Sequence, residues 1–299
     1  MQPIYDNGLP TYENIKKTIS GLKGRYPCIK TFSIGKSHLQ KEIHAISIGD
    51  KDFVLLAGGF HSLEWITAML MLRFAEDLCR AIDTKEELAG TNVTKAMKGK
   101  GVIIIPCVNP DGTEMILNGT ESSGTLYQKV HGIAKGDLKN WQANANGVDI
   151  NHNFDAGWHI LREMEEKEGI RSFAPRQFGG IHPESEPETK AICDLCRKTS
   201  FRHAAAFHSQ GEEIYWHYGR NTPEKSRLMA EIFASSSGYK PSHPDGLASH
   251  GGFKDWFIDY FKRPAFTIEV GKGKNPLPFS DFMPIYDKIL EMLLLMVIM

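Results

Sequence analysis

The segment FVLLAGGFHSLEWIT, residues 53–67, changes character halfway along its length. Its first half is nearly all apolar, with β-branched and small side chains, which is typical of a strand buried on both faces. Its last residues begin a helical pattern that continues to Ile82. His61 and Glu64 stand at the junction between the two patterns. Because ligands of α/β sheets bind at the carboxyl ends of strands, this junction is a candidate site.

The rest of the chain repeats this alternation of short apolar runs and longer helical patterns. Further strands are predicted at 31–34, 43–48, 101–109, 203–208 and 265–270. Helices are predicted at 12–22, 65–82, 186–199, 224–237 and 281–299. Strands that alternate with helices predict an α/β protein with one mixed sheet covered by helices on both faces.

Helix ends and loops are also marked in the sequence. Gly24 is expected to end the first helix, and a capping box from Ser185 to Glu188 is expected to start the helix of 186–199. Three long stretches show little periodicity, and loops of such length in a compact protein are usually functional. We expect these stretches to rim a single pocket: 109–148, 172–184 and 238–254.

The composition is that of a folded protein with no strongly charged face. The 299 residues are 41% hydrophobic and 24% charged, which excludes a disordered, collagen-like or fibrous chain. Lys and Arg total 35 against 36 for Asp and Glu, so a net charge of −1 gives no electrostatic footprint for nucleic acid or for an anionic membrane. The apolar tail from Met292 to Met299 is too short to span a bilayer and is expected to form a buried helix.

The cysteines indicate a reducing environment. The chain has five, an odd number, and two of them lie in apolar runs, which favours free thiols over a disulfide framework. Cys193 and Cys196 form a single CxxC within a predicted helix, where apolar packing is favoured over a structural zinc site. The first residues show neither the basic region nor the apolar core of a signal peptide. A cytoplasmic location is therefore expected.

Three of the apolar runs carry ionisable residues at or near their carboxyl ends. His61 and Glu64 follow the first run, His208 closes another, and Glu269 lies within the last. Two histidines and one glutamate are the ligands of open catalytic zinc sites, which keep a fourth position for water. A buried carboxylate is costly unless it faces a cavity, a partner or a metal, so Glu269 is interpreted as a general base. The alternative interpretation is two satisfied histidines that cap strands and a paired carboxylate.

Seven motifs, in order over nearly the whole chain, resemble those of the zinc metallocarboxypeptidases, the carboxypeptidase A-like superfamily. They are HSLEWIT at 61–67, NPDG at 109–112, GVDINHNFDAGW at 147–158, SEPET at 185–189, HS at 208–209, GGFKDW at 251–256 and FTIEV at 266–270. The resemblance implies a single catalytic domain over residues 1–299. It also implies a three-layer α/β/α sandwich around a mixed eight-stranded sheet.

The same resemblance implies roles for individual residues. It places one Zn2+ per chain on His61, Glu64 and His208, and it makes Glu269 the catalytic base. Asp149 matches the acid that orients the first ligand histidine, and such a partner fixes the ring and its tautomer. The oligomeric state is left open.

Departures from the family pattern concern substrate binding. Usual members carry arginines where this chain has Leu63, Gln142 and His152, and a mobile tyrosine where it has Leu247. Because arginine binds carboxylates bidentately, their loss argues against a standard C-terminal exopeptidase. The substrate-binding positions that the resemblance implies are Gln142, Asn151, His152, Ser209, Leu247 and Lys254.

Lys254 stands where the family contacts the side chain of the substrate. A buried ammonium needs an anionic partner, which a substrate can supply. Within the superfamily, the motifs NPDGTEMILNG, NWQANANGVDIN, SEPET and FKDWFI look most like those of the bacterial γ-D-glutamyl-L-diamino acid peptidases. That resemblance implies hydrolysis of the γ-D-glutamyl–meso-diaminopimelate bond, with the second carboxylate of diaminopimelate beside Lys254. The alternative is that Lys254 pairs with Asp255 or Asp259, or points to solvent.

The expected partner is a peptidoglycan-derived peptide, a muropeptide, with no nucleic acid and no membrane. Three other functions stay open: an ordinary zinc carboxypeptidase with altered carboxylate recognition, a related zinc acyl-amino-acid amidohydrolase, and a catalytically silent zinc-binding module. The silent module is disfavoured because the predicted ligands and the predicted base are all present.

Overall fold

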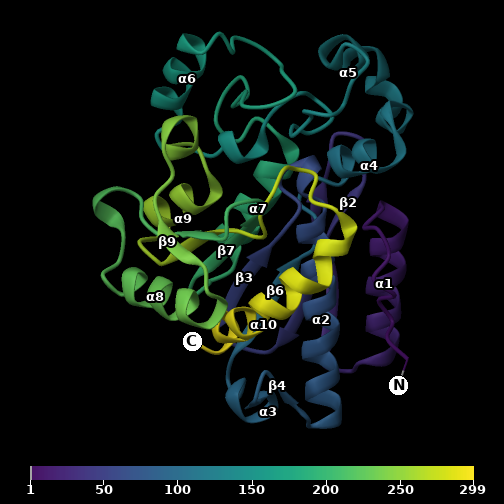
Figure 1. Cartoon of the computed structure of the whole chain (residues 1–299), viewed down its shortest axis with the longest axis vertical. Helices are drawn as coiled ribbons and strands as arrows, with labels where there is room; N and C mark the ends of the chain where they lie inside the picture. The colour runs from purple at the N-terminus through teal and green to yellow at the C-terminus, as the bar shows by residue number, and fades with distance from the viewer. Residues whose placement is uncertain (1) are drawn as a thin grey trace.

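The computed structural model describes residues 2–299, and one mixed sheet runs through its centre (Figure 1). In this part of the chain the sheet has eight strands in the order β1-β2-β6-β3-β7-β10-β8-β9. Their bounds are β1 Ile29–Lys36, β2 Glu42–Gly49, β3 Phe53–Ala57, β6 Gly101–Ile105, β7 Ala204–His208, β8 Glu213–Tyr215, β9 Lys240–Ser242 and β10 Ala265–Glu269. A separate two-stranded sheet is formed by β4 Glu87–Leu88 and β5 Thr91–Asn92.

The strands β6, β3, β7 and β10 form the parallel centre of the sheet. On one side β2 joins β6 in antiparallel pairing, and on the other β8 joins β10 in the same way. These four central strands correspond to the four apolar runs of the sequence, as expected for strands buried on both faces. Because they are parallel, the carboxyl ends of β3, β7 and β10 lie side by side at one edge.

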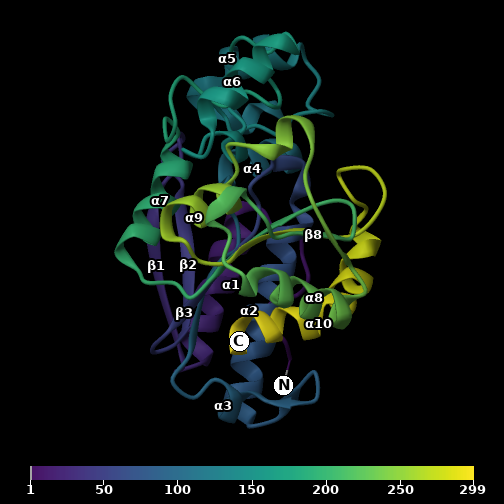
Figure 2. The ribbon, with the colours of Figure 1, turned by 90° about the vertical axis from the view of Figure 1, so that its left-hand side faces the viewer.

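Helices cover both faces of the sheet, and successive residues of each central strand enter different apolar clusters. In β3, Val54 and Leu56 lie in the cluster with α1, α2, α8 and α10, whereas Leu55 and Ala57 lie in the cluster with α7 and α9. Figures 1 and 2 show these helices on either side of the strands. The bounds are α1 Tyr12–Arg25, α2 Ile66–Thr84, α7 Pro187–Lys198, α8 Lys225–Ser237, α9 Phe253–Phe261 and α10 Phe282–Ile298. The predicted three-layer sandwich around an eight-stranded mixed sheet is confirmed.

Further helices gather beyond the carboxyl ends of the central strands, in teal at the top of Figure 1. They are α4 Pro110–Asn118, α5 Tyr127–Ala134 and α6 Trp158–Lys167, and α3 Val93–Ala96 lies elsewhere. The 3-10 turns are η1 Ser62–Glu64, η2 Thr120–Leu126, η3 Ile150–His152, η4 Gly219–Asn221, η5 Gly246–Ser249 and η6 Phe279–Asp281. A third apolar cluster, with Met115, Val130 and Trp141 among its members, joins α4 and α5 to the following segment. The prediction that 109–148 is loop was therefore wrong, because short helices give too few turns for a clear period.

Two predicted helix ends differ from the structure, and a proline explains each. Helix α1 continues past Gly24 to Arg25, and Tyr26, which precedes Pro27, takes up the extended conformation that a following proline favours. The capping box before α7 does not form. Glu186 precedes Pro187, is extended and occupies the N-cap position without a side-chain cap bond.

The predictions for the C-terminal tail and the CxxC pair are confirmed. Met292, Leu293 and Met296 of α10 are buried in the core, and Cys193 and Cys196 are buried in the cluster with α7 and α9. All five cysteines are free thiols. Within residues 2–299, every helix is too short or too polar to cross a membrane.

Candidate metal centre

Three neighbouring strand ends bring the predicted site residues together. His61 follows β3 by a short turn, His208 is the last residue of β7, and Glu269 is the last residue of β10. Glu269 lies directly beside His208 in the parallel pairing of β10 with β7. The topology of the sheet therefore places side chains from distant parts of the sequence at one edge.

The turn after β3 has a local structure that only certain residues permit. Gly59 has a φ of +63°, and a Cβ there would lie 2.9 Å from the Cα of Cys107, so the position requires glycine. The Gly59 amide donates to Thr67 Oγ1 at 2.8 Å, and Thr67 Oγ1 donates to the Glu64 carbonyl at 2.7 Å. These two bonds fix η1, which carries Glu64, against the first turn of α2.

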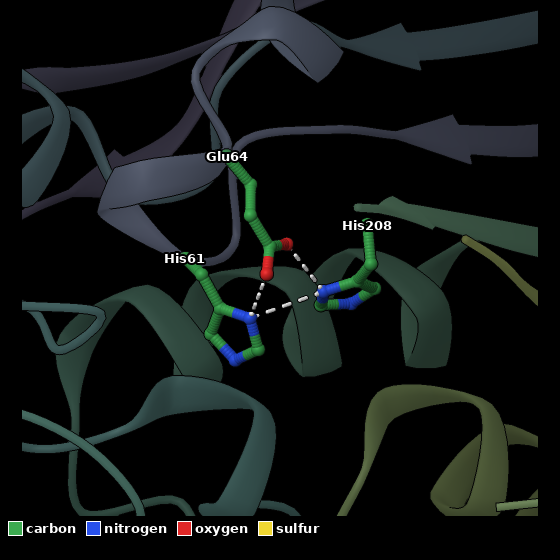
Figure 3. A group of neighbouring side chains, drawn as sticks. All are labelled: His61, Glu64 and His208. Carbon is green, nitrogen blue, oxygen red and sulfur yellow. Dashed lines mark hydrogen bonds and ion pairs between the residues drawn. The ribbon is translucent and has the colours of Figure 1, made fainter. Parts of the chain in front are cut away.

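The donor atoms of His61, Glu64 and His208 converge on one point (Figure 3). The Nδ1 atoms of the two histidines are 3.3 Å apart. Each Nδ1 is 2.9 Å from a different carboxylate oxygen of Glu64. Glu64 and His208 are buried, and His61 is partly exposed. The cluster therefore offers two nitrogen donors and one carboxylate to a single ion.

Asp149 contacts His61 from the side opposite to the cluster. Its Oδ1 is 3.0 Å from His61 Nε2, so the carboxylate holds a proton on Nε2, and Nδ1 is the nitrogen that faces the other donors. Asp149 is the N-cap of η3, and its Oδ2 accepts from the Gln177 amide at 3.1 Å. Its position is therefore fixed by the backbone on both sides.

The geometry and the charges of the cluster fit a zinc ion. Ligand atoms at about 2.0–2.1 Å from a tetrahedral zinc lie about 3.3–3.4 Å apart, which matches the separation of the two nitrogens. Burial opposes ionisation of Glu64, but His61 and His208 outweigh it and lower its pKa to about 2. Burial lowers the pKa of His208 below its usual value, which favours the neutral ligand form. Burial also lowers the pKa of His61, but Glu64 and Asp149 raise it well above normal, so a metal would replace a proton there.

Glu269 is the acid nearest to this cluster on β10. Burial, followed by repulsion from the Glu64 carboxylate, raises its pKa well above the usual range. Glu213, which pairs with Glu269 across the antiparallel β8, adds to this effect. A positive ion beside Glu64 would oppose that repulsion and favour the ionised form, which is the form that accepts a proton.

The sequence profile described as zinc carboxypeptidase matches residues 15–292 of this chain. The chain belongs to the zinc carboxypeptidase family. It is therefore a zinc metallopeptidase with zinc as its cofactor, and the resemblance inferred from the motifs is confirmed.

Individual relatives of this family member agree with that assignment. Gamma-D-glutamyl-L-diamino acid endopeptidase 1 of Lysinibacillus sphaericus is 35% identical over 288 residues, which are 95% of this chain and 71% of that protein. Bovine thrombin-activatable fibrinolysis inhibitor, solved with tick carboxypeptidase inhibitor, has a TM-score of 0.75 at 22% identity and 97% coverage of both chains. Murein-tripeptide amidase MpaA of Escherichia coli O157 has a TM-score of 0.56 at 20% identity, over 92% of this chain and 94% of that one. The two solved structures show the shared fold.

Two predicted substrate-binding residues of this zinc carboxypeptidase family member lie close to the donors. The Gln142 carbonyl accepts from the amide of Ser62, the residue after His61, at 3.2 Å. The Asn151 amide donates to Asp149 Oδ1 at 3.1 Å. Both residues are partly exposed, and their roles toward substrate stay predictions.

His152 and Leu247 face other surroundings. The buried His152 has its Nδ1 3.0 Å from Glu165 Oε1 of α6. Burial lowers the pKa of His152, but Asp149 and Glu165 outweigh this and raise it. Leu247 lies in η5 and lines a pocket of about 520 Å3 whose lining, among residues 2–299, contains none of the metal donors. Neither side chain hydrogen-bonds to the three donors, and a role of either in substrate binding stays a prediction.

Lys254 has its anionic partner within the chain. Its Nζ pairs with the carboxylate of Asp255 and donates to the His217 carbonyl at 2.9 Å, and both charged side chains are buried. It also lies 5.6 Å from the centre of the Tyr218 ring. The anionic partner that its burial requires is therefore Asp255, as the alternative had it, and a role of Lys254 toward substrate stays a prediction.

Sequence reasoning missed Asn275, which lies at the edge of the metal centre. Its Nδ2 is 3.5 Å from Glu64 Oε1 and donates to the Ser209 carbonyl at 2.6 Å. Ser209 Oγ, at a predicted substrate-binding position, donates to Asn275 Oδ1 at 2.8 Å. The sequence feature that could have indicated Asn275 is the Gly- and Lys-rich stretch GKGKNP at 271–276, which directly follows the strand of the predicted base.

Proposed function

We propose that this zinc peptidase hydrolyses the γ-D-glutamyl–meso-diaminopimelate amide bond in peptides derived from peptidoglycan. The observation that carries the proposal is the 35% identity, over 95% of the chain, to a protein named as a gamma-D-glutamyl-L-diamino acid endopeptidase. Leu63 and Gln142, where usual family members carry arginines, support an activity other than removal of a C-terminal residue. The free thiols support the cytoplasm as the place of action.

In this proposal His61, Glu64 and His208 hold the zinc, and Asp149 keeps the proton on His61 Nε2. Zinc, when bound, supplies a Lewis acid that polarises the scissile carbonyl and lowers the pKa of a water molecule. The chain contributes a rigid set of donors, because η1 is hydrogen-bonded to α2 and His208 is part of the sheet. Rigid donors hold their geometry during turnover.

Glu269 moves the proton. Its carboxylate accepts a proton from the attacking water and then donates it to the nitrogen of the leaving diaminopimelate amine. Its place on β10 beside His208 supports this role, since the strand pairing fixes its distance from the donor cluster. Its partial exposure leaves it accessible to substrate.

Mass spectrometry of defined stem peptides tests the proposal. The purified protein is incubated with L-Ala-γ-D-Glu-meso-diaminopimelate, with the corresponding tetrapeptide, and with an α-linked peptide that ends in free glutamate. We expect cleavage of the first two at the γ-glutamyl bond. Cleavage of the α-linked peptide alone would replace the proposal with an ordinary carboxypeptidase.

Two variants separate metal binding from proton transfer. Glu269→Gln should retain zinc and the thermal midpoint of the parent while kcat falls by about 100-fold or more, because the amide cannot accept the proton. His208→Ala should lose zinc under chelator challenge, since two donors bind far more weakly than three. Metal analysis and kcat are measured on both. Retention of zinc by His208→Ala, or near-parent turnover by Glu269→Gln, would refute the corresponding role.

A further inference from the structure

A pocket of about 640 Å3 opens beside the metal centre. Its lining includes Leu63, which directly precedes the donor Glu64, and Asn275, whose amide lies 3.5 Å from Glu64 Oε1. A substrate whose reacting amide sits at the donor cluster therefore has a neighbouring group in this pocket. The volume lies within the usual range of ligand pockets.

The lining of the pocket combines an apolar wall with a surplus of positive charge. Lys139 and Lys274, from segments far apart in the sequence, both face it. The opposing charge is Asp137, whose carboxylate is 3.7 Å from Lys139 Nζ, and within residues 2–299 Lys274 takes part in no ion pair. The apolar wall is formed by Leu63, Met115, Ile116, Leu138 and Pro276. A short aliphatic chain that carries a carboxylate fits both features.

We propose that Lys139 and Lys274 bind the free α-carboxylate of the D-glutamyl residue whose γ-amide is cleaved. This inference rests on the proposed function. In a γ-linked glutamate the α-carboxylate is separated from the scissile carbonyl carbon by an extended chain of about 5 Å, made of two methylenes and the α-carbon. The methylenes then pack on Leu63, and the carboxylate reaches the lysines. An α-linked residue has no main-chain carboxylate at this place, so the lysines select the γ-linkage.

A pair of substrates that differ only in this carboxylate tests the inference. L-Ala-γ-D-Glu-meso-diaminopimelate is compared with the same peptide in which the α-carboxylate is a carboxamide. We expect the parent protein to cleave the acid with a kcat/KM about three- to tenfold higher, as two ion pairs with exposed lysines allow. The double variant Lys139→Met/Lys274→Met should lose this preference through a higher KM for the acid, with the amide substrate unchanged.

Two controls test whether the preference for the acid depends on Lys139 and Lys274 and on the glutamyl carboxylate. Lys272→Met removes a lysine that is close in sequence but pairs with Glu212 at 2.9 Å, and it should keep the preference. A third peptide, with L-lysine in place of diaminopimelate, retains the glutamyl carboxylate and should respond to the double variant like the parent peptide. Equal losses on the acid and the amide, an unchanged preference, or a response confined to the diaminopimelate peptide would overturn the inference. Failure of the parent protein to cleave any γ-linked peptide would instead overturn the proposed function and the inference with it.

Discussion

His61 lies between two carboxylates, that of Glu64, which belongs to the candidate donor cluster, and that of Asp149, which does not. Glu64 lies 2.9 Å from its Nδ1, and Asp149 lies 3.0 Å from its Nε2. A neutral imidazole carries one proton, so the position of that proton determines which nitrogen can bind a metal. Asp149 determines this by accepting a hydrogen bond from the Nε2–H group, and the ring then needs no tautomeric change when a metal binds.

Asp149→Asn should therefore weaken zinc binding without removing a ligand. The amide can present a donor to Nε2 and stabilise the wrong tautomer, so we expect the dissociation constant for zinc to rise by about 10- to 100-fold. Competition with a chromophoric chelator measures it. Asp155→Asn, at a nearby exposed aspartate, is the matched control and should bind zinc like the parent. Parent-like affinity in Asp149→Asn would show that Asp149 does not orient the ring.

The sequence located the candidate metal donors of the structure because they close an apolar strand or follow one by a short turn. The apolar character and the short length of such strands locate them in the sequence. Parallel pairing then brings the carboxyl ends of neighbouring strands together. The surroundings of Lys254 were not predictable in the same way. Whether its ammonium contacts Asp255 or a ligand depends on side-chain rotamers and on the course of β8, and neither has a periodic signal. Asn275 was missed because it lies in a loop, and the periodicity of nearby residues does not show that this loop returns to the metal centre.

At the scale of elements, one asparagine connects the segment that carries Asp149 to helix α7. The buried Asn144 accepts at Oδ1 from the amides of Asn146 and Val148, at 3.0 and 3.1 Å. Its Nδ2 donates to Glu186 at 2.8 Å and to Glu188 at 3.1 Å. Asn144 therefore sets the turn that leads to Asp149.

The two carboxylates that Asn144 contacts have unlike environments. Burial raises the pKa of Glu188 to about 7. For Glu186, burial acts in the same direction, but hydrogen bonds from His38 and Asn144 outweigh it and lower the pKa. The Nε2 of His38 lies 2.7 Å from Glu186, so the tip of the β1–β2 hairpin also joins this network.

Asn144→Ala should loosen the turn and act on the metal at a distance. The carboxylates of Glu186 and Glu188 and the backbone amides of the turn would lose their hydrogen-bond partner. We expect this to lower the free energy of unfolding by about 1–3 kcal/mol. We also expect about a three- to tenfold weaker zinc affinity, because Asp149 follows the turn. Chemical denaturation and chelator competition measure the two effects. Asn146→Ala, which removes the bond to Glu186 at 3.2 Å and the bond from Lys129 but leaves Asn144 in place, is the milder control. Loss of stability with unchanged zinc affinity would limit Asn144 to a structural role.

The length of a helix or strand determines how well its position can be predicted from the sequence. The long helices α2, α8 and α10 and the central strands were predicted within a few residues, because each contains several periods of its pattern. The edge strands β8 and β9 have three residues each, which is too short for an alternation to be recognised. The helices α4 and α5 were taken for loop for the same reason.

At the scale of the whole molecule, His203 joins the sheet to the C-terminal helix. Its ring is buried just before β7, and its Nε2 donates to the Met296 carbonyl of α10 at 2.7 Å. Burial lowers its pKa to about 4, and Arg202 and Lys225 act in the same direction against the hydrogen bond. The ring is thus neutral in the folded protein at any pH near neutrality.

This histidine should make the folded protein less stable in mild acid. Between about pH 6.5 and pH 4 the unfolded chain binds a proton at His203 and the folded chain does not, so stability falls as the pH falls through this window. From pH 7 to pH 5 the loss due to His203 is about 2 kcal/mol. Denaturant unfolding of the parent and of His203→Gln at both pH values measures it. The variant should lose about 2 kcal/mol less than the parent, and equal losses would contradict the assignment.

The distance along the chain between the zinc donors has a consequence for biosynthesis. His61 and His208 are 147 positions apart, and Glu269 emerges from the ribosome later still. Bringing His61 and His208 together closes a long loop of chain, and the entropy cost of this closure must be met before the contacts can stabilise the fold. The donor cluster therefore forms only after β3 and β7 have paired. We therefore expect zinc to bind late in folding. A chain that holds zinc through all three donors must already have paired β3 with β7.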